Sequence, residues 1–196
     1  MADGGPAADA GLVARARDGD VEAFGRLVER HQDHIYNAVY HLVGSEQDAE
    51  DIAQDVFMRA YSHLNGFQGR ARFSTWLYGI MLNAVRSHWR RAGPRRTVSL
   101  EGAGDETRAD PPATGDGPVR RAVRREHVDA VRGAIAELEE EWREIIVLRD
   151  IRGLSYEELA ETLDLPAGTV KSRLHRARAA LRDKLEPLMG GVGEGL

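Results

Sequence analysis

Ser155-Tyr-Glu-Glu-Leu-Ala-Glu-Thr-Leu163 and the segment after it, Asp164-Leu-Pro-Ala-Gly-Thr-Val-Lys-Ser-Arg173, specify the fold of the C-terminal half of this chain. Ser155 with Glu158 three residues later is a capping box, which begins a short helix. Leu165-Pro-Ala-Gly168 is a tight turn, and its proline suits the first position of a second helix that we expect to end near Leu185. A short helix, a tight turn and a longer helix predict a helix-turn-helix.

The second helix of this motif has one apolar and one polar side. Its apolar positions have helical spacing and are Val170, Leu174, Ala177 and Leu181. Its outward side near the N-terminus carries Lys171, Ser172, Arg173, His175 and Arg176. Such side chains donate hydrogen bonds to phosphates and base edges in a DNA major groove. The alternative is an ordinary helical bundle with a basic, exposed helix end.

The rest of the chain also has helical periodicity. Asp20 is the expected N-cap of a helix that ends at Gly44, and Ser45 followed by Asp48 opens the next helix. A third helix is expected from about Ser74, with Asn83, Arg86, Ser87 and Arg90 on its polar face. Two more helices are expected over 123–138 and 140–151.

The clearest boundary is the segment 93–119, which is rich in proline and glycine and poor in large apolar residues. Such a composition predicts a flexible linker. We therefore expect an all-α chain of two small helical domains, at 20–92 and 120–187. The remaining parts are expected to be a flexible N-terminus with a short helix at 1–19 and a disordered tail at 188–196.

Composition excludes several classes of protein. The 196 residues include no Cys, so a disulfide scaffold and a cysteine nucleophile are excluded. The formal net charge of the chain is -5. The sequence predicts no signal peptide and no membrane insertion, and hence a soluble, cytoplasmic protein.

Charge is distributed unevenly along both halves. In the first half, acids predominate over 20–55, whereas 56–96 has arginines and no acid. In the second half, the Glu-rich segment 137–164 is followed by a basic segment at 165–182. Two basic surfaces on an acidic protein indicate two contacts with a polyanion, although two ordinary solvated faces are the alternative. In the first basic surface, Phe67, Arg70 and Trp76 suit unstacked bases of single-stranded DNA, but such rings also suit a core.

Catalytic and metal-binding functions have little support. His31, Asp33 and His34 could form a metal cluster, but His31 shares the apolar stripe of its helix with Val28 and Ile35. No Gly-rich phosphate loop, nucleophile elbow or HExxH motif is present. We expect no enzyme activity, no catalytic residue, no cofactor and no metal.

Four stretches together resemble one family. They are Asp18-Gly-Asp-Val-Glu-Ala-Phe24, Asp48-Ala-Glu-Asp-Ile-Ala-Gln-Asp-Val-Phe57, Phe67-Gln-Gly-Arg-Ala-Arg-Phe-Ser-Thr-Trp-Leu-Tyr78, and Gly153-Leu-Ser-Tyr-Glu-Glu-Leu-Ala160 with Gly168-Thr-Val-Lys-Ser-Arg173. In this order they resemble the extracytoplasmic function (ECF) sigma factors of bacterial RNA polymerase. The resemblance implies a sigma region 2 helical bundle and a sigma region 4 helix-turn-helix.

The resemblance also implies partners and site residues. Asp51, Gln54 and Asp55 match the helix that docks on the β′ clamp helices of core RNA polymerase, whose β subunit is a further expected contact. Phe67, Tyr78 and Asn83 match the positions around a flipped base of the minus-ten element, with Arg86 and Arg90 beside them for the single-stranded DNA backbone. Lys171, Ser172, Arg173, His175 and Arg176 match the residues that bind the minus-thirty-five duplex. An anti-sigma factor is a further candidate partner.

One competing interpretation belongs to a different class. Leu159-Ala160 and Thr169-Val-Lys171 also suit the LuxR-type helix-turn-helix of a free-standing transcriptional regulator. Such a protein would carry a sensing domain in place of 48–78 and would bind its operator without polymerase.

Overall fold

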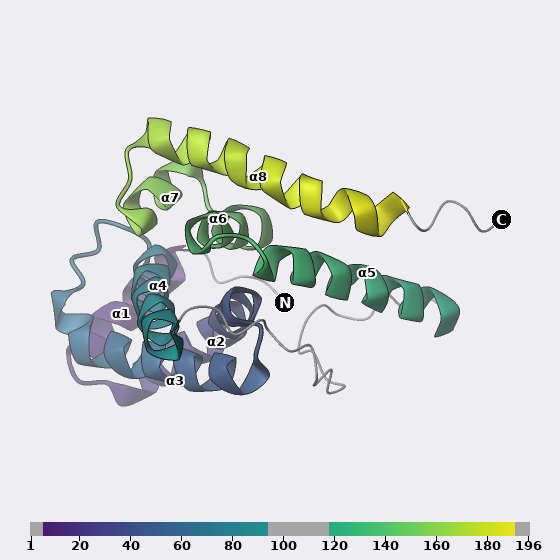
Figure 1. Cartoon of the computed structure of the whole chain (residues 1–196). Coiled ribbons are helices and arrows are strands. Elements are labelled where there is room, and N and C mark those ends of the chain that lie inside the picture. Colours follow the sequence, from purple (N-terminus) through teal and green to yellow (C-terminus); the bar gives the residue numbers. More distant parts are fainter. Residues whose placement is uncertain (1–5, 94–117, 191–196) are drawn as a thin grey trace.

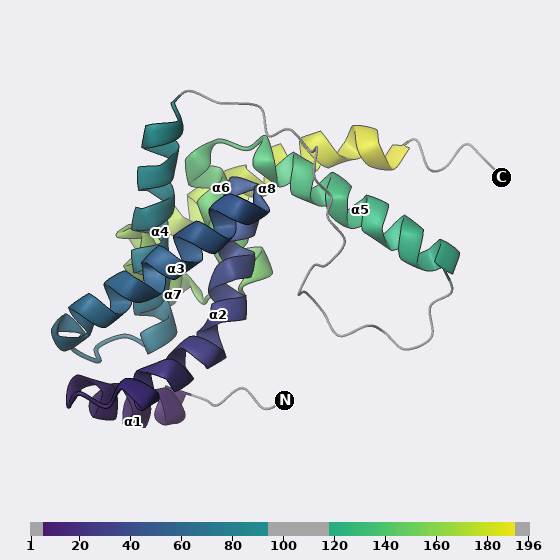
Figure 2. The same cartoon turned by 90° about the horizontal axis from the view of Figure 1, so that it is seen from below.

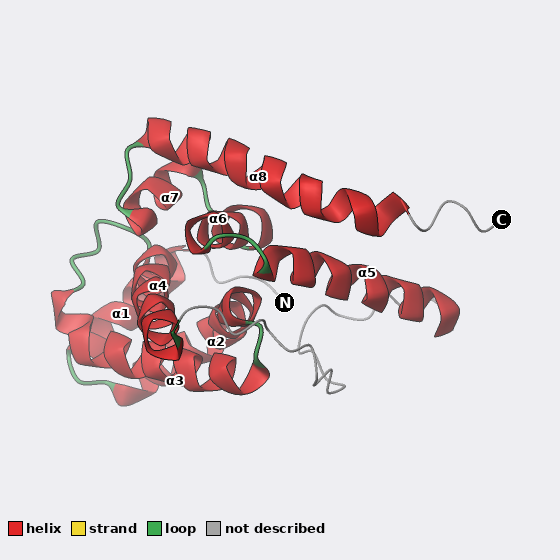
Figure 3. Ribbon diagram, in the orientation of Figure 1, coloured by secondary structure: helices red, strands yellow, loops and turns green. Residues whose placement is uncertain are grey.

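The protein is all helical in the parts that the structure describes. The computed structural model describes residues 6–93 and 118–190, and in these two ranges it contains helices and loops without a strand (Figure 3). The predicted all-α fold is confirmed.

The first half begins with α1 (Pro6–Arg17), α2 (Val21–Val43) and α3 (Glu46–His63). The Asp20 side chain accepts a hydrogen bond from the Ala23 amide at 3.0 Å and caps α2, which ends at Gly44 with φ +78°. Ser45 then caps α3 through the Asp48 amide at 3.3 Å. Both caps lie where the sequence predicts them, because capping depends on residues only three positions apart.

A short 3₁₀ turn, η1 (Leu64–Gly66), leads from α3 into a loop and then into α4 (Phe73–Ala92). The core of this half lies between α2, α3 and α4. Its fully buried members include Leu27, Leu42, Val56, Leu77 and Met81. Truncation of one such leucine to alanine typically costs about 2–5 kcal/mol of stability.

The second half consists of α5 (Pro118–Ala136), α6 (Glu140–Ile146), a π-helical turn η2 (Val147–Ile151), α7 (Tyr156–Leu163) and α8 (Ala167–Gly190). Ser155 and Glu158 form both hydrogen bonds of the capping box. Asp164 then adopts the left-handed conformation (φ +53°), which aspartate tolerates better than most residues, and turns the chain toward α8. Val170 and Leu174 of α8 are buried with Leu159 of α7, so these helices form the predicted helix-turn-helix.

The ends of the two halves differ in detail from the sequence expectation. The short helix expected within 1–19 spans Pro6–Arg17, and α1 buries Leu12 and Val13. Its Asp9 carboxylate lies 2.8 Å from His31 Nε2 and 3.1 Å from Arg30 Nη1 of α2. These are long-range partners, which a local pattern does not reveal.

The predicted linker and the two ends lie largely outside the described residues, which omit 1–5, 94–117 and 191–196. The last helix, α8, runs to Gly190 and is thus longer than the helix expected to end near Leu185.

The two halves pack against each other in one continuous hydrophobic core. In Figure 1, α7 and α8 lie on the side of α4 opposite α3, while α5 and α8 extend side by side away from the first half. Figure 2 shows the same arrangement from below, with α6 next to the end of α2. There Arg143 of α6, which is buried, donates a hydrogen bond to the carbonyl oxygen of Leu42 at 2.8 Å, and its guanidinium lies 5.3 Å from the centre of the Trp89 ring.

Candidate nucleic-acid and partner interfaces

The outer face of α3 is acidic and open. Asp51 and Gln54 are exposed, and the Asp55 carboxylate pairs with Arg59 at 2.7 Å. Ile52 and Val56, on the opposite side of the helix, hold α3 on the core. Met58, seven residues after Asp51 and therefore on the same side, is 63% exposed. The face thus combines carboxylates with an exposed apolar side chain, which the sequence analysis did not single out.

The loop between η1 and α4 forms one wall of a pocket of about 260 Å³. Phe67, Gly69 and Arg70 line it from the loop, and Thr75, Trp76 and Gly79 line it from α4. The opposite wall comes from Glu161 and Thr162 of α7, in the other half of the chain.

Aromatic rings support this pocket from beneath. The Phe67 ring centre lies 5.1 Å from that of Trp76 and 5.9 Å from that of Phe73. Phe67 and Phe73 are buried, whereas Trp76 is half-buried. Phe67 therefore belongs to the core and to the pocket lining at once, Trp76 lines the pocket, and Phe73 belongs to the core alone.

Two of the predicted minus-ten residues make hydrogen bonds to the second half of the chain. The Arg86 guanidinium makes two hydrogen bonds to the Glu144 carboxylate of α6, at 2.7 and 2.6 Å, and these hydrogen bonds raise the pKa of Arg86. The Tyr78 hydroxyl accepts a hydrogen bond from Arg152 Nε at 3.0 Å, and Tyr78 is buried. Neither side chain lines the pocket.

The other predicted minus-ten residues on α4 have side chains open to solvent. Asn83 and Arg90 are exposed, and Arg90 Nη2 donates to Ser87 Oγ at 2.8 Å. Asn83 lies one turn beyond Gly79, on the side of α4 that faces the pocket, although it is not part of the pocket lining. Sequence reasoning therefore placed Asn83 and Arg90 correctly on a polar face but did not anticipate the partner of Arg86.

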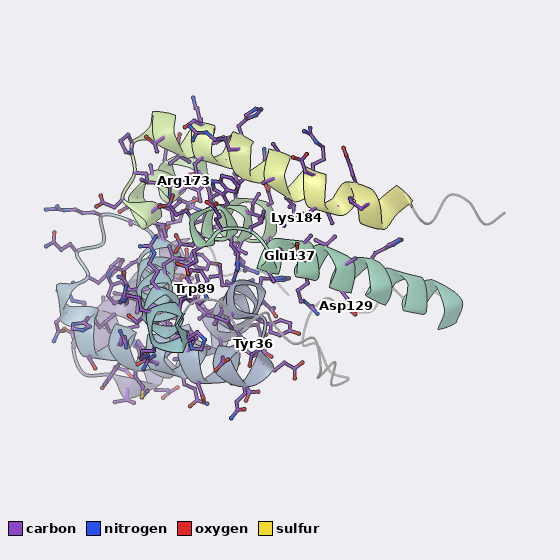
Figure 4. All side chains as sticks on the ribbon, in the orientation of Figure 1. Tyr36, Trp89, Asp129, Glu137, Arg173 and Lys184 are labelled. Atoms are coloured by element: carbon purple, nitrogen blue, oxygen red, sulfur yellow. The ribbon has the colours of Figure 1, made fainter. Side chains whose placement is uncertain are left out.

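On α8, four of the five predicted residues are exposed. Lys171, Ser172, His175 and Arg176 lie on its outer side, and the Ser172 hydroxyl donates to the Thr169 carbonyl oxygen at 3.1 Å. Arg173 is different, because its side chain is only 20% exposed and pairs with Glu141 of α6 at 3.1 Å. Figure 4 shows Arg173 between α8 and the helices beneath it. The Arg173 guanidinium is therefore engaged within the protein, whereas the other four predicted residues of α8 are exposed.

The histidines that the sequence analysis weighed as metal ligands and set aside have protein partners. His31 lies against Asp9, as described above, and Arg152 Nη2 contacts His34 Nδ1. Among the described residues, no group of three His, Asp or Glu side chains is arranged to hold a metal ion. The same part of the chain contains no helix with the length and apolarity needed to cross a membrane.

Comparison with family models gives two matches. The model for sigma-70 region 2 matches residues 27–95, and the model for sigma-70 region 4 matches residues 129–181. A LuxR-like regulator is not favoured, because the region where it would carry a sensing domain is matched by sigma region 2.

Relatives match nearly the whole chain. RNA polymerase sigma-H factor of Pseudomonas aeruginosa is 37% identical over 188 residues, which cover 92% of this chain and 95% of the relative. ECF RNA polymerase sigma factor SigW of Bacillus subtilis is 37% identical over 179 residues, covering 90% and 96%.

Two solved structures have the same fold. CnrH in complex with the cytosolic domain of CnrY matches with a TM-score of 0.67 and 30% identity, covering 92% of this chain and 98% of that one. The sigma factor RpoE from Bartonella quintana, in complex with the anti-sigma factor NepR, matches with a TM-score of 0.63 and 27% identity, covering 83% and 96%. Since both regions and almost the full length match in order, the chain belongs to the ECF family of RNA polymerase sigma factors.

Proposed function

We propose that this sigma factor directs core RNA polymerase to its promoters through three separate surfaces of the two domains, 20–92 and 120–187. One acidic surface on α3 binds the polymerase, and two basic surfaces, on α4 and α8, bind DNA. The observation that carries the proposal is this separation of charge within one chain. An acidic surface would repel DNA but attract a basic protein partner, whereas arginine and lysine side chains favour phosphates.

The acidic surface consists of Asp51, Gln54 and Asp55 together with Met58. We assign it to the β′ clamp helices, because exposed carboxylates around an apolar side chain suit a partner helix with basic and apolar positions. The domain at 120–187 is proposed to contact the β subunit.

The minus-ten surface consists of Phe67, Tyr78, Asn83, Arg86 and Arg90. Phe67 and Trp76 line the pocket described above, and an unstacked base favours an aromatic wall. Asn83 carries both a donor and an acceptor and suits a base edge, while Arg86 and Arg90 suit the phosphates. The minus-thirty-five surface consists of Lys171, Ser172, Arg173, His175 and Arg176, presented to a duplex major groove by α8.

Three broader properties complete the proposal. The protein acts in the cytoplasm with polymerase, and it has no catalytic activity of its own. An anti-sigma factor is a further partner, since one structural neighbour of similar length is a sigma factor bound to such a protein.

Reconstituted transcription tests the proposal directly. Core RNA polymerase with this protein on a randomised promoter library should give transcripts from templates that share two sequence elements upstream of the start site. Core polymerase alone is the control. Transcription without a shared element, or tight sequence-specific DNA binding by the protein alone, would contradict the proposal.

Reversal of charge on α3 tests the polymerase surface. Replacement of both Asp51 and Asp55 by lysine should abolish co-purification with core polymerase, because the attractive charges become repulsive. The same reversal at Glu22 and Glu29, which are exposed on α2 of the same half, is the matched control and should leave binding intact. Circular dichroism should show unchanged helix content in both variants. Equal binding by the two variants would remove the α3 assignment.

A further inference from the structure

Helix α1 carries a buried carboxylate whose two oxygens contact α2. The Oδ2 atom of Asp9 lies 2.8 Å from His31 Nε2, and its Oδ1 atom lies 3.1 Å from Arg30 Nη1. A carboxylate accepts hydrogen bonds and does not donate them, so His31 Nε2 is the donor and Asp9 fixes the orientation of the imidazole ring. The His31 side chain is only 12% exposed, whereas that of Arg30 is 38% exposed. Asp9 thus has one partner inside the helical bundle and one at its surface.

The His31 ring in turn lies against the first residue of α4. Its centre is 5.5 Å from the centre of the Phe73 ring. Phe73 is buried, and its ring centre lies 5.9 Å from that of Phe67, edge-on, and 5.7 Å from that of Trp76. Phe67 and Trp76 are the rings that line the pocket. A continuous series of ring contacts therefore leads from the partner of Asp9 to the aromatic wall of the pocket.

Other residues of α1 anchor this helix on the first half. Leu12, Val13 and Ala16 are buried, and α1 contacts α2, η1 and α4. Figure 2 shows α1 beside the start of α2. Apolar burial is the main source of such packing, whereas the desolvation of a buried carboxylate offsets much of its attraction to its partners. Asp9 is therefore better suited to orient a neighbouring side chain than to anchor α1.

We propose that Asp9 is a positioning residue for the minus-ten pocket: it fixes the His31 ring, which supports Phe73 and, through it, the two lining rings. The inference rests on the proposed function, which assigns Phe67 to the minus-ten surface. It gives a role in promoter recognition to α1, which precedes the residues 27–95 matched by the sigma region 2 model. Stacking on a base depends on the position and tilt of the rings, so a small displacement lowers discrimination without unfolding the domain.

Three substitutions separate the orientation of His31 from charge and from the anchoring of α1. Asp9→Ala removes the acceptor of His31. Asp9→Asn removes the same charge but keeps an oxygen that can accept from His31 Nε2, while the exposed Arg30 can turn to solvent. Arg30→Gln is the matched control, because it removes the other partner of Asp9 and leaves the contact with His31 in place.

A fourth substitution keeps the test decisive even where Asp9→Ala does not fold. His31→Gln retains an amide that can donate to Asp9 but removes the ring beside Phe73. It leaves α1 bonded to α2 and breaks the series of rings. His31→Gln should therefore act in the same direction as Asp9→Ala.

The first measurement is fluorine NMR of the full chain labelled with fluorotryptophan, which gives one resonance for each of the three Trp residues. Trp76→Phe identifies the resonance of Trp76. This resonance should shift in Asp9→Ala and in His31→Gln, and should stay in place in Asp9→Asn and Arg30→Gln. Trp89 and Trp142 do not belong to the series of rings, and their resonances serve as internal references.

The second measurement is transcription by core polymerase with each variant, on promoters randomised at the minus-ten or at the upstream element. Asp9→Ala and His31→Gln should lower discrimination at one minus-ten position about tenfold, within the range of a lost base contact, and leave preference at the upstream element unchanged. Asp9→Asn and Arg30→Gln should remain within about twofold of the unmodified protein. Helix content measured by circular dichroism should be equal in all of them.

Several results would overturn the inference. An unmoved Trp76 resonance, or unchanged minus-ten discrimination, in both Asp9→Ala and His31→Gln would show that the rings do not transmit the change. Equal losses at the two promoter elements would mean that Asp9 only stabilises the chain. Losses in Asp9→Asn or Arg30→Gln as large as in Asp9→Ala would assign the effect to charge or to anchoring. Failure of the proposed function would look different: the unmodified protein would show no minus-ten preference, while the Trp76 resonance would still shift in Asp9→Ala.

Discussion

Arg86 and Arg90 lie one turn apart on α4 yet differ in what they can do in the free protein. Arg86 is neutralised by Glu144, whereas Arg90 is exposed and donates a hydrogen bond to the Ser87 hydroxyl. On α8 the same contrast separates Arg173, paired with Glu141, from the exposed Arg176. The immediate electrostatic partner of an arginine thus decides whether it can bind a phosphate without a prior rearrangement.

Asn83 and Arg176 should act on different promoter elements. Asn83→Ala should lower discrimination at one minus-ten position by about 1–3 kcal/mol, the usual contribution of a side chain that binds a base edge. Arg176→Ala should weaken use of the upstream element and leave minus-ten preference intact. Transcription from randomised promoters by polymerase carrying each variant measures both preferences. The assignment of two surfaces to two elements fails when both variants shift preference at the same element.

The capping box of α7 connects helix formation to the packing of the two halves. Ser155 Oγ accepts from the Glu158 amide at 3.1 Å, while Glu158 Oε2 accepts from the Ser155 amide at 2.8 Å. The other oxygen of the same carboxylate faces Arg72 and Thr75. One glutamate therefore both begins α7 and holds this helix on the first half.

Ser155→Ala should lower the free energy of unfolding by about 1 kcal/mol, because the Glu158 amide loses its side-chain acceptor. Urea denaturation followed by circular dichroism measures the loss. Ser62→Ala is the matched control, since Ser62 donates only to the Met58 carbonyl oxygen within α3 and its loss should change stability by less than about 0.5 kcal/mol. Equal losses in the two variants would show that the capping box contributes nothing specific.

The interface between the halves also contains a buried titratable group. His41 of α2 is half-buried with its Nδ1 atom covered, the charges of Arg132 and Arg152 act on it, and its ring centre is 6.4 Å from that of Tyr40. Burial, and to a smaller degree these two arginines, lower the pKa of His41 from 6.5 to about 4. His41 is therefore neutral in the packed molecule and protonates when the chain unfolds below pH 6.5.

The packed form should accordingly lose stability as the pH falls from 6.5 toward 4. At pH 5 the unfolded chain binds a proton at His41 that the packed chain does not, which costs about 2 kcal/mol relative to pH 7. Urea denaturation at both pH values should show a loss larger by this amount in the unmodified protein than in His41→Gln. An identical pH dependence in the two proteins would contradict the lowered pKa.

Helix positions could be predicted from the sequence because their causes are local. Asp20, Ser45 and Ser155 each cap a helix through an amide three residues later, and apolar residues repeat every three or four positions. The same locality made the outer face of α8 predictable: once the apolar stripe is buried, Lys171 and Arg176 can only point to solvent.

The partners of the site residues could not be found in this way. Arg86 and Glu144 are 58 positions apart, Tyr78 and Arg152 are 74 apart, and Thr75 and Glu158 are 83 apart. No helical period relates such residues, so their pairing depends on how the second half packs on the first. The arginine pattern of a sequence thus identifies surfaces that can bind a polyanion. Only the tertiary structure brings Glu144 to Arg86 and Arg152 to Tyr78. The physical reason is that a buried charge such as Glu144 needs an opposite charge beside it, and the packing of the two halves decides which residue supplies that charge.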